Sequence, residues 1–396
     1  MELTTSSVEG KRRIVSLDMM RGFAILGIFL VNMLSFHTPF LYIEPLEWWE
    51  DPLDQGIYMF IDIFIQASFY PLFSMLFGYG LVMLSEKTQQ KGLSFYPIAL
   101  RRLFFLLIVG LSHAIFVWHG DILFNYALLG FIFLLFIKVS GKKILVLGSI
   151  FYLLPNLLLL GLLSMAVMLM SGAESTVSVP LLASQSVDIY QYGTFLEITK
   201  QRIADWSYTN NIFGFILMFF TLFPLFLIGG GAAKYKWFEK TSQYRKSFMN
   251  AFFITFILGL FFKLTPYLGT ANLATYYMQD MFGGPLLAIS YGLMIAHLAE
   301  IKWLHKIVTV ISSVGRMSFS HYLFQSILST LIFYQYGLGL YGQVSVASGT
   351  LLVLLIYGSQ LIFSMLWLKY FYYGPLEWVW RNFTYKSKQK LGRDVS

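Results

Sequence analysis

The sequence contains no cysteine, few histidines and few charged residues. None of its 396 residues is Cys, six are His, and Asp, Glu, Lys and Arg together make up 12% of the chain. Without thiols there are no disulfides and no thiolate metal sites, and six scattered histidines form no recognisable metal-binding cluster. A soluble domain carries roughly 25% charged residues, because its surface must be hydrated. The low charge content therefore excludes a water-soluble protein of this size.

Apolar residues, by contrast, make up 57% of the chain and fall in long unbroken runs. A run of about 20 apolar residues is long enough to cross a membrane as a helix. The short alternating segments of a β-barrel are missing, and the hydrophobicity excludes a disordered chain. The sequence therefore predicts an all-α, polytopic membrane helix bundle with about ten transmembrane helices. The predicted spans are 19–38, 57–84, 103–118, 122–137, 144–170, 208–232, 248–266, 281–300, 317–335 and 346–370.

The basic residues predict how these spans are oriented. If the N-terminus is cytoplasmic, all but four of the 28 Lys and Arg residues fall in cytoplasmic segments. The exceptions are Arg21, Lys200, Arg202 and Lys263. Because the cytoplasmic loops of membrane proteins are enriched in Lys and Arg, we expect both termini to be cytoplasmic. The net charge of +8 then reflects these loops, and no nucleic-acid partner is expected.

No repeat or linker divides the chain, so we expect a single integral membrane domain over 1–396. The longest predicted outer loop is 171–207, which is Ser-rich at its start. Its later part, 190–206, mixes apolar and polar residues in a pattern typical of an amphipathic helix lying on the membrane.

Two groups of polar residues stand out within the predicted spans. Asp18 and Arg21 lie one turn apart at the start of the first span, with Asn32 further along it, and His113 and Asp121 flank the connection between the third and fourth spans. A charge at the bilayer centre costs at least ~2.5–3.5 kcal/mol, so such residues border a cavity or bond to a neighbour. A carboxylate beside a neutral His orients it and makes it more basic, as a general base requires. The structural alternatives are a local Asp–Arg pair that fixes the helix end and a His bonded to a nearby carbonyl.

Further polar residues occur in other spans. Arg316, His321 and Gln325 lie near the cytoplasmic half of the ninth span, and Asp62 and Gln66 share one face of the second. His321 and Gln325 are four residues apart, which is also typical of a contact between packed helices. No metal, haem or flavin motif is present, so no metal site and no cofactor are expected.

Five segments resemble the YeiB-like family of uncharacterised bacterial membrane proteins. The resemblance implies a bacterial cytoplasmic membrane protein, with a C-terminal YeiB-type half over about 208–390. The segments are RIVSLDMMRGFAILGIFLVNM (13–33), FSMLFGYG (73–80), GLSHAIFVWHGDILFNY (110–126), GRMSFSHYLFQS (315–326) and GPLEWVWRNFTY (374–385).

The first span is also similar to that of two families of membrane acyltransferases, so the N-terminal half, about 11–170, is acyltransferase-like. These families are bacterial surface-polysaccharide O-acetyltransferases and the lysosomal heparan-glucosaminide N-acetyltransferase group. In the former, an Arg and a catalytic His are separated by ten residues. In this chain the same spacing separates Arg21 from Asn32, so His37 and His113 are the nearest substitutes for the catalytic His.

The leading hypothesis is a transmembrane acyltransferase that moves an acyl group from cytoplasmic acyl-CoA to an outer-face acceptor. His113 would be the base, Asp121 its orienting partner and Asn32 an oxyanion donor. The predicted substrate-binding residues are Asp18, Arg21, Arg316 and Gln325, with Arg101 and Arg102 as further phosphate-binding candidates at the inner face.

Two alternatives remain open. One is a membrane transporter of a small or amphipathic solute, although the spans contain no matched pair of Gly/Pro-broken segments. The other is a structural or assembly protein whose polar residues only hold helices together. Membrane lipids are expected partners in all three cases.

Overall fold

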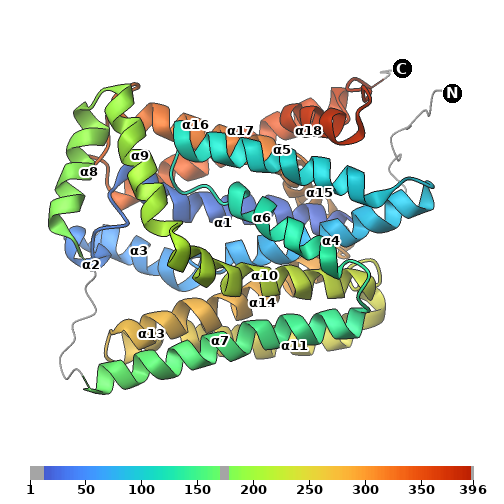
Figure 1. Ribbon diagram of the computed structural model, residues 1–396, viewed down its shortest axis with the longest axis horizontal. Coiled ribbons are helices and arrows are strands. Elements are labelled where there is room, and N and C mark those ends of the chain that lie inside the picture. Colours follow the sequence, from blue (N-terminus) through green and yellow to red (C-terminus); the bar gives the residue numbers. More distant parts are fainter. Residues whose placement is uncertain (1–12, 170–177, 394–396) are drawn as a thin grey trace.

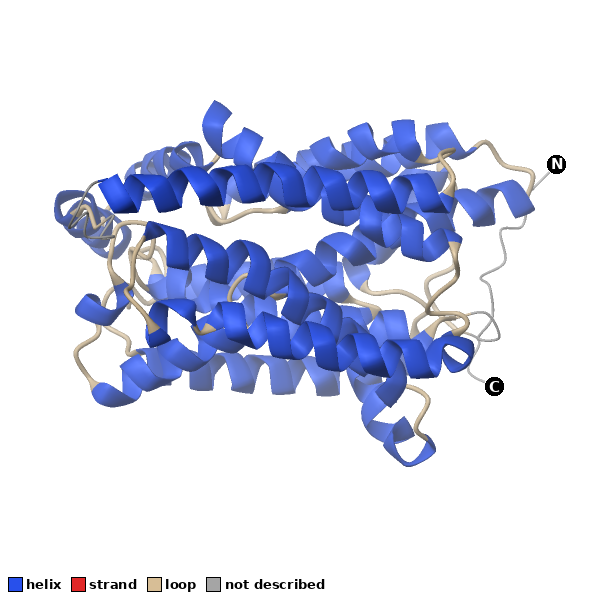
Figure 2. Cartoon of the chain, turned by 90° about the horizontal axis from the view of Figure 1, so that it is seen from below, coloured by secondary structure: helices blue, strands red, loops and turns tan. Residues whose placement is uncertain are grey.

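The protein is a bundle of helices that run roughly along one axis (Figures 1 and 2). The structure, a computed structural model, describes residues 13–169 and 178–393. Within these residues the only β-type pairing is an isolated bridge between Phe371 and Gly392. Residues 171–177, the Ser-rich start of the predicted outer loop, lie outside the described residues.

Eight helical segments of the described chain are long and apolar enough to cross a membrane. Two of them are composite: α3 (Pro52–Phe64) continues into α4 (Phe69–Gln90), and α13 (Leu273–Met278) continues through η3 (Gln279–Gly283) into α14 (Gly284–Leu298). The other six are α1 (Val15–His37), α5 (Phe95–Phe116), α7 (Gly141–Leu169), α10 (Ile212–Lys234), α11 (Thr241–Lys263) and α17 (Val346–Tyr370).

The other two predicted spans correspond to shorter helices. The span 122–137 coincides with α6 (Leu123–Phe133) and η2 (Leu134–Phe136), and 317–335 with α16 (Ser318–Phe333). Both are shorter than the ~20 residues typical of a helix that crosses the hydrocarbon core. The remaining helices are α2 (Pro45–Trp48), α8 (Pro180–Tyr192), α9 (Phe195–Thr209), α12 (Thr265–Leu268), η4 (Lys302–Leu304), α15 (His305–Gly315) and α18 (Pro375–Tyr385).

Helix α1 lies at the centre of the bundle (Figure 1), where it packs against α4, α14, α15, α16 and α17. Helix α10 packs between α4 and α7, and α11 packs against α14. Helices α7 and α11 lie at one side of the bundle, and few of their residues are buried. An exposed surface of this size and composition fits lipid contact.

Glycines allow α1 and α15 to cross at very short distance. A Cβ atom on Gly22 would lie 2.2 Å from the carbonyl oxygen of Ile311, and one on Gly315 would lie 1.8 Å from that of Asp18. Small residues that let helix backbones touch are typical of membrane helix packing. The crossing fixes Arg316, the residue after Gly315, close to the start of α1.

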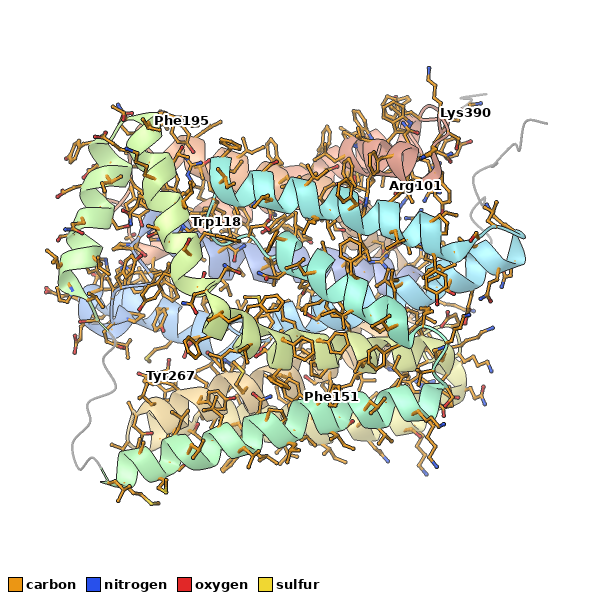
Figure 3. All side chains as sticks on the ribbon, in the orientation of Figure 1. Arg101, Trp118, Phe151, Phe195, Tyr267 and Lys390 are labelled. Carbon is orange, nitrogen blue, oxygen red and sulfur yellow. The ribbon has the colours of Figure 1, made fainter. Side chains whose placement is uncertain are left out.

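The two ends of the bundle differ in chemistry. The start of α1 and helix α18 lie at the same end (Figure 1), and Arg101 and Lys390 lie toward it in Figure 3. We call this the basic end. Phe195 and Tyr267 lie toward the other end, which α8 and α9 cover, and which we call the opposite end.

Candidate functional site

A cavity of about 490 Å³ opens at the basic end, between the start of α1, the end of α4, α5 and α18. We call it the basic vestibule. Its charged lining consists of Arg13, Arg21, Lys87, Lys91, Arg102, Arg316 and Arg381, with Asp18 and Glu377 as the acidic members. Seven cations against two carboxylates give the vestibule an excess of positive charge. Such a cleft attracts anions from solution.

Asp18 organises the entrance of the vestibule. Its carboxylate accepts a hydrogen bond from Arg13 Nε at 2.5 Å and one from Arg21 Nη1 at 3.0 Å. The Asp18–Arg21 contact is the local pair that the sequence allowed as an alternative. Both side chains nevertheless line the vestibule, so the pair also positions a guanidinium at its wall.

Helix α18 completes the vestibule and is anchored by Glu377. The Glu377 carboxylate accepts hydrogen bonds from the backbone N–H groups of Phe319 and Ser320, and from the Ser320 hydroxyl at 2.5 Å. A carboxylate at the first turn of α16 meets the positive end of that helix. Burial is the main reason why the pKa of Glu377 is raised.

Two arginines of the vestibule are held mainly by aromatic or backbone groups. The guanidinium of Arg102 lies 3.8 Å from the ring centroid of Trp380 on α18. Arg316 donates only a long hydrogen bond, 3.4 Å, to the Tyr372 carbonyl. Burial, reinforced by the charge of Arg13, lowers the pKa of Arg316 to about 10, so it remains a cation at neutral pH.

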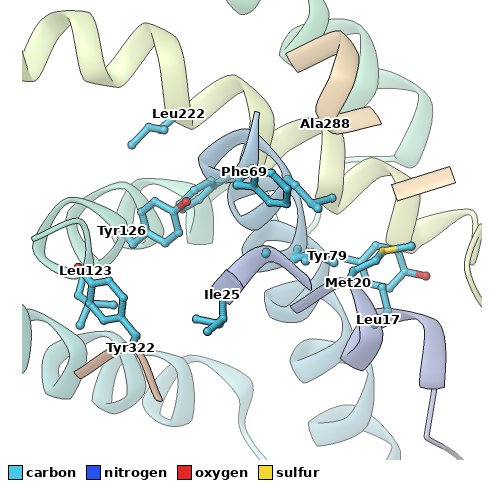
Figure 4. Packing of buried hydrophobic residues seen from close by; sticks show 14 of the residues in the cluster. Leu17, Met20, Ile25, Phe69, Tyr79, Leu123, Tyr126, Leu222, Ala288 and Tyr322 are labelled. Carbon is cyan, nitrogen blue, oxygen red and sulfur yellow. The ribbon is translucent and has the colours of Figure 1, made fainter. Parts of the chain in front are cut away.

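A second cavity, of about 220 Å³, shares Asp18, Arg21, Arg102 and Arg316 with the vestibule and extends into the bundle. We call it the deep cavity. Its inner wall consists of Ile25, Ile28, Leu123, Tyr126 and Tyr322, four of which appear in Figure 4. The deep cavity therefore joins the basic end to the middle of the bundle.

The lining residues of α1 are spaced as one helix face. Asp18, Arg21, Ile25 and Ile28 recur at intervals of three and four, and Asn32 is the next position on that face. Asn32 is half-buried and makes no hydrogen bond to another described residue, but it does not line the deep cavity. Of the predicted residues on α1, Asp18 and Arg21 thus border the cavity, and Asn32 lies beyond it.

The predicted His113–Asp121 pair is present. His113 Nδ1 lies 2.8 Å from Asp121 Oδ2, and both side chains are buried. The other carboxylate oxygen, Oδ1, accepts the backbone N–H of Phe124 at 2.8 Å, so Asp121 also fixes the start of α6. His113 Nε2 has no hydrogen-bond partner among the described residues.

Tyr322 connects this pair to the deep cavity. Its ring centroid lies 5.4 Å from that of His113, and its side chain lines the cavity wall. Sequence reasoning did not single out Tyr322, Tyr126 or Glu377, because nothing in a linear pattern shows which helix the first two face or that α18 folds back onto α16.

The structure does not bring Gln325 to the cavity. Gln325 Nε2 donates to Gln360 Oε1 at 2.9 Å, and His321 Nε2 lies 2.6 Å from the Ser364 hydroxyl. All four side chains are buried between α16 and α17. This is the helix-packing contact that their spacing of four residues also allowed.

A separate polar cluster occupies the opposite end. Asp205 on α9 accepts hydrogen bonds from Tyr42, Tyr190 and Gln201 at 2.6 to 2.7 Å. His119 Nδ1 lies 3.7 Å from the same carboxylate. The pKa of His119 is lowered, chiefly by burial. Asp205 could not be recognised from sequence, because Tyr42 is 163 residues away from it.

A third polar cluster lies where two composite helices are interrupted. The chain breaks between α3 and α4, where Ala67 has a left-handed φ of 55°, and η3 is a π-helical turn between α13 and α14. Asp62 accepts from Tyr267 at 2.6 Å and from Gln279 at 2.5 Å. Beside them, buried Lys263 pairs with Asp280 at 3.1 Å.

Metal binding has no support in the described part of the chain. There, no group of three or more His, Asp and Glu side chains is placed to hold a metal ion.

The long apolar helices and their buried polar residues define an all-helical, multi-pass membrane protein. Comparison with known proteins identifies its relatives. Residues 232–387 match the family described as "Protein of unknown function (DUF418)". The chain is 35% identical to the uncharacterized protein YxaH of Bacillus subtilis (strain 168), over 96% of each chain. It is 29% identical to the uncharacterized protein YeiB of Escherichia coli (strain K12), over 95% of this chain and 97% of YeiB.

The protein therefore belongs to the DUF418 family of YeiB and YxaH, as the five sequence segments predicted. An uncharacterized 39.9 kDa protein of Bacillus acidopullulyticus is 29% identical over 95% of both chains. No solved structure matches the chain.

Proposed function

We propose that the protein is a transmembrane acyltransferase that uses a phosphorylated acyl donor, acyl-CoA, from the basic end and an acceptor from the opposite end. One observation carries the proposal: His113, bonded to Asp121, keeps Nε2 free beside Tyr322, where the deep cavity leads in from a vestibule of seven cations. A free ring nitrogen on a carboxylate-oriented His is what a general base requires.

The proposal includes an orientation in the membrane. The basic end is the cytoplasmic side, with both termini there, and α6 and α16 cross the membrane together with the eight longer segments. The support is the distribution of Lys and Arg, which follows the preference of cytoplasmic loops for positive charge. The protein then lies in the bacterial cytoplasmic membrane.

The chemical step balances without a metal. His113 Nε2 takes the proton of an acceptor hydroxyl as its oxygen attacks the thioester carbonyl carbon. The C–S bond then breaks, and the leaving thiolate takes the proton from the imidazolium. An ester and free CoA result, and His113 returns to its neutral form. Asp121 holds the imidazole in the tautomer with Nδ1 protonated and stabilises the transient imidazolium.

The first test uses the purified full-length protein in proteoliposomes with radiolabelled acetyl-CoA and water as a slow acceptor. We expect donor hydrolysis, and we expect His113→Ala to reduce it at least ~100-fold, in line with the usual contribution of a general base. His119→Ala is the matched control, because it removes a buried histidine six positions along without touching the deep cavity. Equal rates in the wild type and His113→Ala would eliminate the assignment.

A second candidate function, a transporter of a small solute, is favoured by the third polar cluster. Interrupted helices that meet at buried charged residues are typical of transporter binding sites. The two interruptions are in contact, since a Cβ atom on Gly284 would lie 2.1 Å from the Ala67 carbonyl oxygen. Solute or proton flux in proteoliposomes without acyl donor, abolished by Asp62→Asn, would support this function; no flux in the wild type would exclude it.

A further inference from the structure

Arg202 on α9 is a fully buried cation that forms no ion pair with a carboxylate among the described residues. Its side chain is 0% exposed, and its only hydrogen bond within that part of the chain runs from Nη1 to the backbone carbonyl of Ile115 at 2.9 Å. Nε and Nη2 have no hydrogen-bond partner among the described residues. A buried, unpaired charge is expensive, so an unpartnered group of this kind needs an explanation.

The two unpartnered nitrogens lie on the same edge of the guanidinium. That edge presents two parallel N–H groups, the fork that binds a carboxylate or phosphate through two oxygens. The end-on nitrogen, Nη1, is the one occupied by the protein. The geometry therefore leaves vacant the part of the side chain that is suited to a planar or tetrahedral oxyanion.

The neighbouring carboxylate does not fill this role. Asp205 is three residues along α9, yet it forms no ion pair with Arg202 among the described residues. Its oxygens already accept three hydrogen bonds, from Tyr42, Tyr190 and Gln201.

Two further unpartnered donors lie in the same region. Among the described residues, the Tyr334 hydroxyl and Trp118 Nε1 are buried without a hydrogen-bond partner. Tyr334 lies under the guanidinium, with its ring centroid 5.9 Å from Arg202 Cζ, and belongs to the same packed cluster as Trp118. Donors without matching acceptors favour an anionic occupant over a cationic one.

Two partly exposed aromatic side chains of the opposite end pack near the guanidinium. Phe195 and Tyr336 lie 5.6 and 5.9 Å from Arg202 Cζ. Their rings contact each other edge-on, with centroids 5.7 Å apart, and Phe195 is 52% exposed. Rotation of these partly exposed rings is a small, local change that opens the site, since exposed side chains change rotamer rapidly.

We propose that Arg202 is the anchor of a binding site for a two-oxygen anion, a carboxylate or a phosphate, at the opposite end of the bundle. The anion site stands on the geometry of Arg202 alone. That the anion belongs to the acyl acceptor rests on the proposed function, and it defines the acceptor class as an acidic molecule, such as a uronic acid or a sugar phosphate, that approaches from that side.

The test measures anion binding without any acyl donor. Full-length protein in detergent is titrated at constant ionic strength with glucuronate, glucose 1-phosphate and uncharged glucose, and thermal unfolding is followed by intrinsic fluorescence. A ligand that binds only the folded state raises the unfolding temperature as its concentration passes Kd. We expect glucuronate or glucose 1-phosphate to raise it and glucose to leave it unchanged; whichever anion binds identifies the chemistry as carboxylate or phosphate.

Two variants test whether the rise in unfolding temperature depends on the Nε and Nη2 groups of Arg202. Arg202→Met keeps the length of the side chain and removes the charge, so the anion-dependent shift should disappear. Arg202→Lys keeps the charge and removes the fork, so Kd should increase about tenfold or more, and this variant decides the matter if Arg202→Met does not fold. No shift in the wild type, or an equal response in the wild type and Arg202→Lys, would overturn the proposal.

The same assay separates this inference from the proposed function. His113→Ala should bind the anion as the wild type does, because His113 packs beside Tyr322 of the deep cavity, whereas Arg202 bonds to the Ile115 carbonyl. Normal anion binding in a protein that never transfers an acyl group would overturn the acyltransferase proposal and leave the anion site intact. Acyl transfer by a protein that binds no anion would overturn the anion site and leave the acyltransferase proposal intact.

Discussion

Two histidine–aspartate pairs lie close together in this protein and have opposite surroundings. In the first, His113 is 2.8 Å from Asp121, whose only other hydrogen bond within the described residues is from the Phe124 N–H. In the second, His119 is 3.7 Å from Asp205, which already accepts three hydrogen bonds. The two histidines are six residues apart in sequence, yet only the first has a carboxylate available to orient it.

The two carboxylates differ in how many other hydrogen bonds they accept. A carboxylate offers about four acceptor sites on two oxygens, and bonds to a charged acceptor are stronger than neutral ones. Asp121 directs one oxygen to the imidazole, which leaves Nε2 available for chemistry. Asp205 directs its oxygens to Tyr42, Tyr190 and Gln201 and ties α8 and α9 to the bundle. The first pair is suited to proton transfer, and the second holds the opposite end together.

The largest effect that tests this contrast is expected from Asp121→Asn. Asp121 accepts from His113 Nδ1 and from the Phe124 N–H with different oxygens, and in asparagine one of the two becomes an NH2 donor, so both bonds cannot be kept. The imidazole then loses its orientation and its charge partner, and acyl transfer should fall about 100-fold or more. The readout is the initial rate of acetyl-CoA turnover in proteoliposomes.

The matched variant for Asp121→Asn is Asp205→Asn, which should retain transfer within a few-fold. A similar loss of turnover in the two variants would show that the pairs are not functionally distinct, and the contrast drawn above would be wrong.

The next largest effect concerns stability. Asp205→Ala leaves the hydroxyls of Tyr42 and Tyr190 buried without an acceptor, and each such group costs about 1–3 kcal/mol. We therefore expect the free energy of unfolding to fall by about 2–4 kcal/mol, measured by denaturant unfolding in detergent micelles. Asp188→Ala, at an exposed position on α8, is the control and should change it by less than about 0.5 kcal/mol. If Asp205→Ala were as stable as that control, Asp205 would not hold the opposite end together.

The sequence predicted the positions of the helices better than their lengths. A helix lies in each of the ten predicted ranges, but only eight helical segments of the described chain are long and apolar enough to cross a membrane, and α6 and α16 are shorter than the spans predicted from them. Hydrophobicity also missed the break between α3 and α4, which lies inside the predicted span 57–84, and the π-helical turn η3, which lies at the start of the predicted span 281–300. Backbone interruptions of this kind depend on tertiary contacts, such as that of Gly284 with Ala67, which composition does not record.

The candidate site was predictable where its residues are near each other in the chain. Asp18 with Arg21, and His113 with Asp121, are three and eight residues apart, and both contacts are present. Gln325 shows the limit, because its spacing from His321 indicates a shared helix face but not that the face meets Gln360 of α17. Asp205 and Arg202 were missed for the same reason, since their partners come from distant segments.

The smallest effect expected is a pH dependence of stability that arises from His119. Burial, with the nearby positive charge of Arg202, lowers its pKa and outweighs the opposing effect of Asp205. In the unfolded chain a His has a pKa of about 6.5. Above that pH both states are neutral at this position, and His119 contributes no pH dependence. As the pH falls through 6.5, the unfolded state takes up a proton that the folded state does not, so the folded protein loses stability.

The test is to measure the free energy of unfolding of the wild type and His119→Gln between pH 7.5 and 5.5. Glutamine keeps a polar group beside Ser35, whose hydroxyl lies 3.3 Å from His119 Nε2, but it does not titrate. The wild type should lose stability below pH 6.5, and His119→Gln should lose less; the other buried histidines, including His37, keep part of the slope. Identical slopes would mean that His119 takes up its proton over the same pH range in the folded and the unfolded protein, so its pKa would not be lowered by folding.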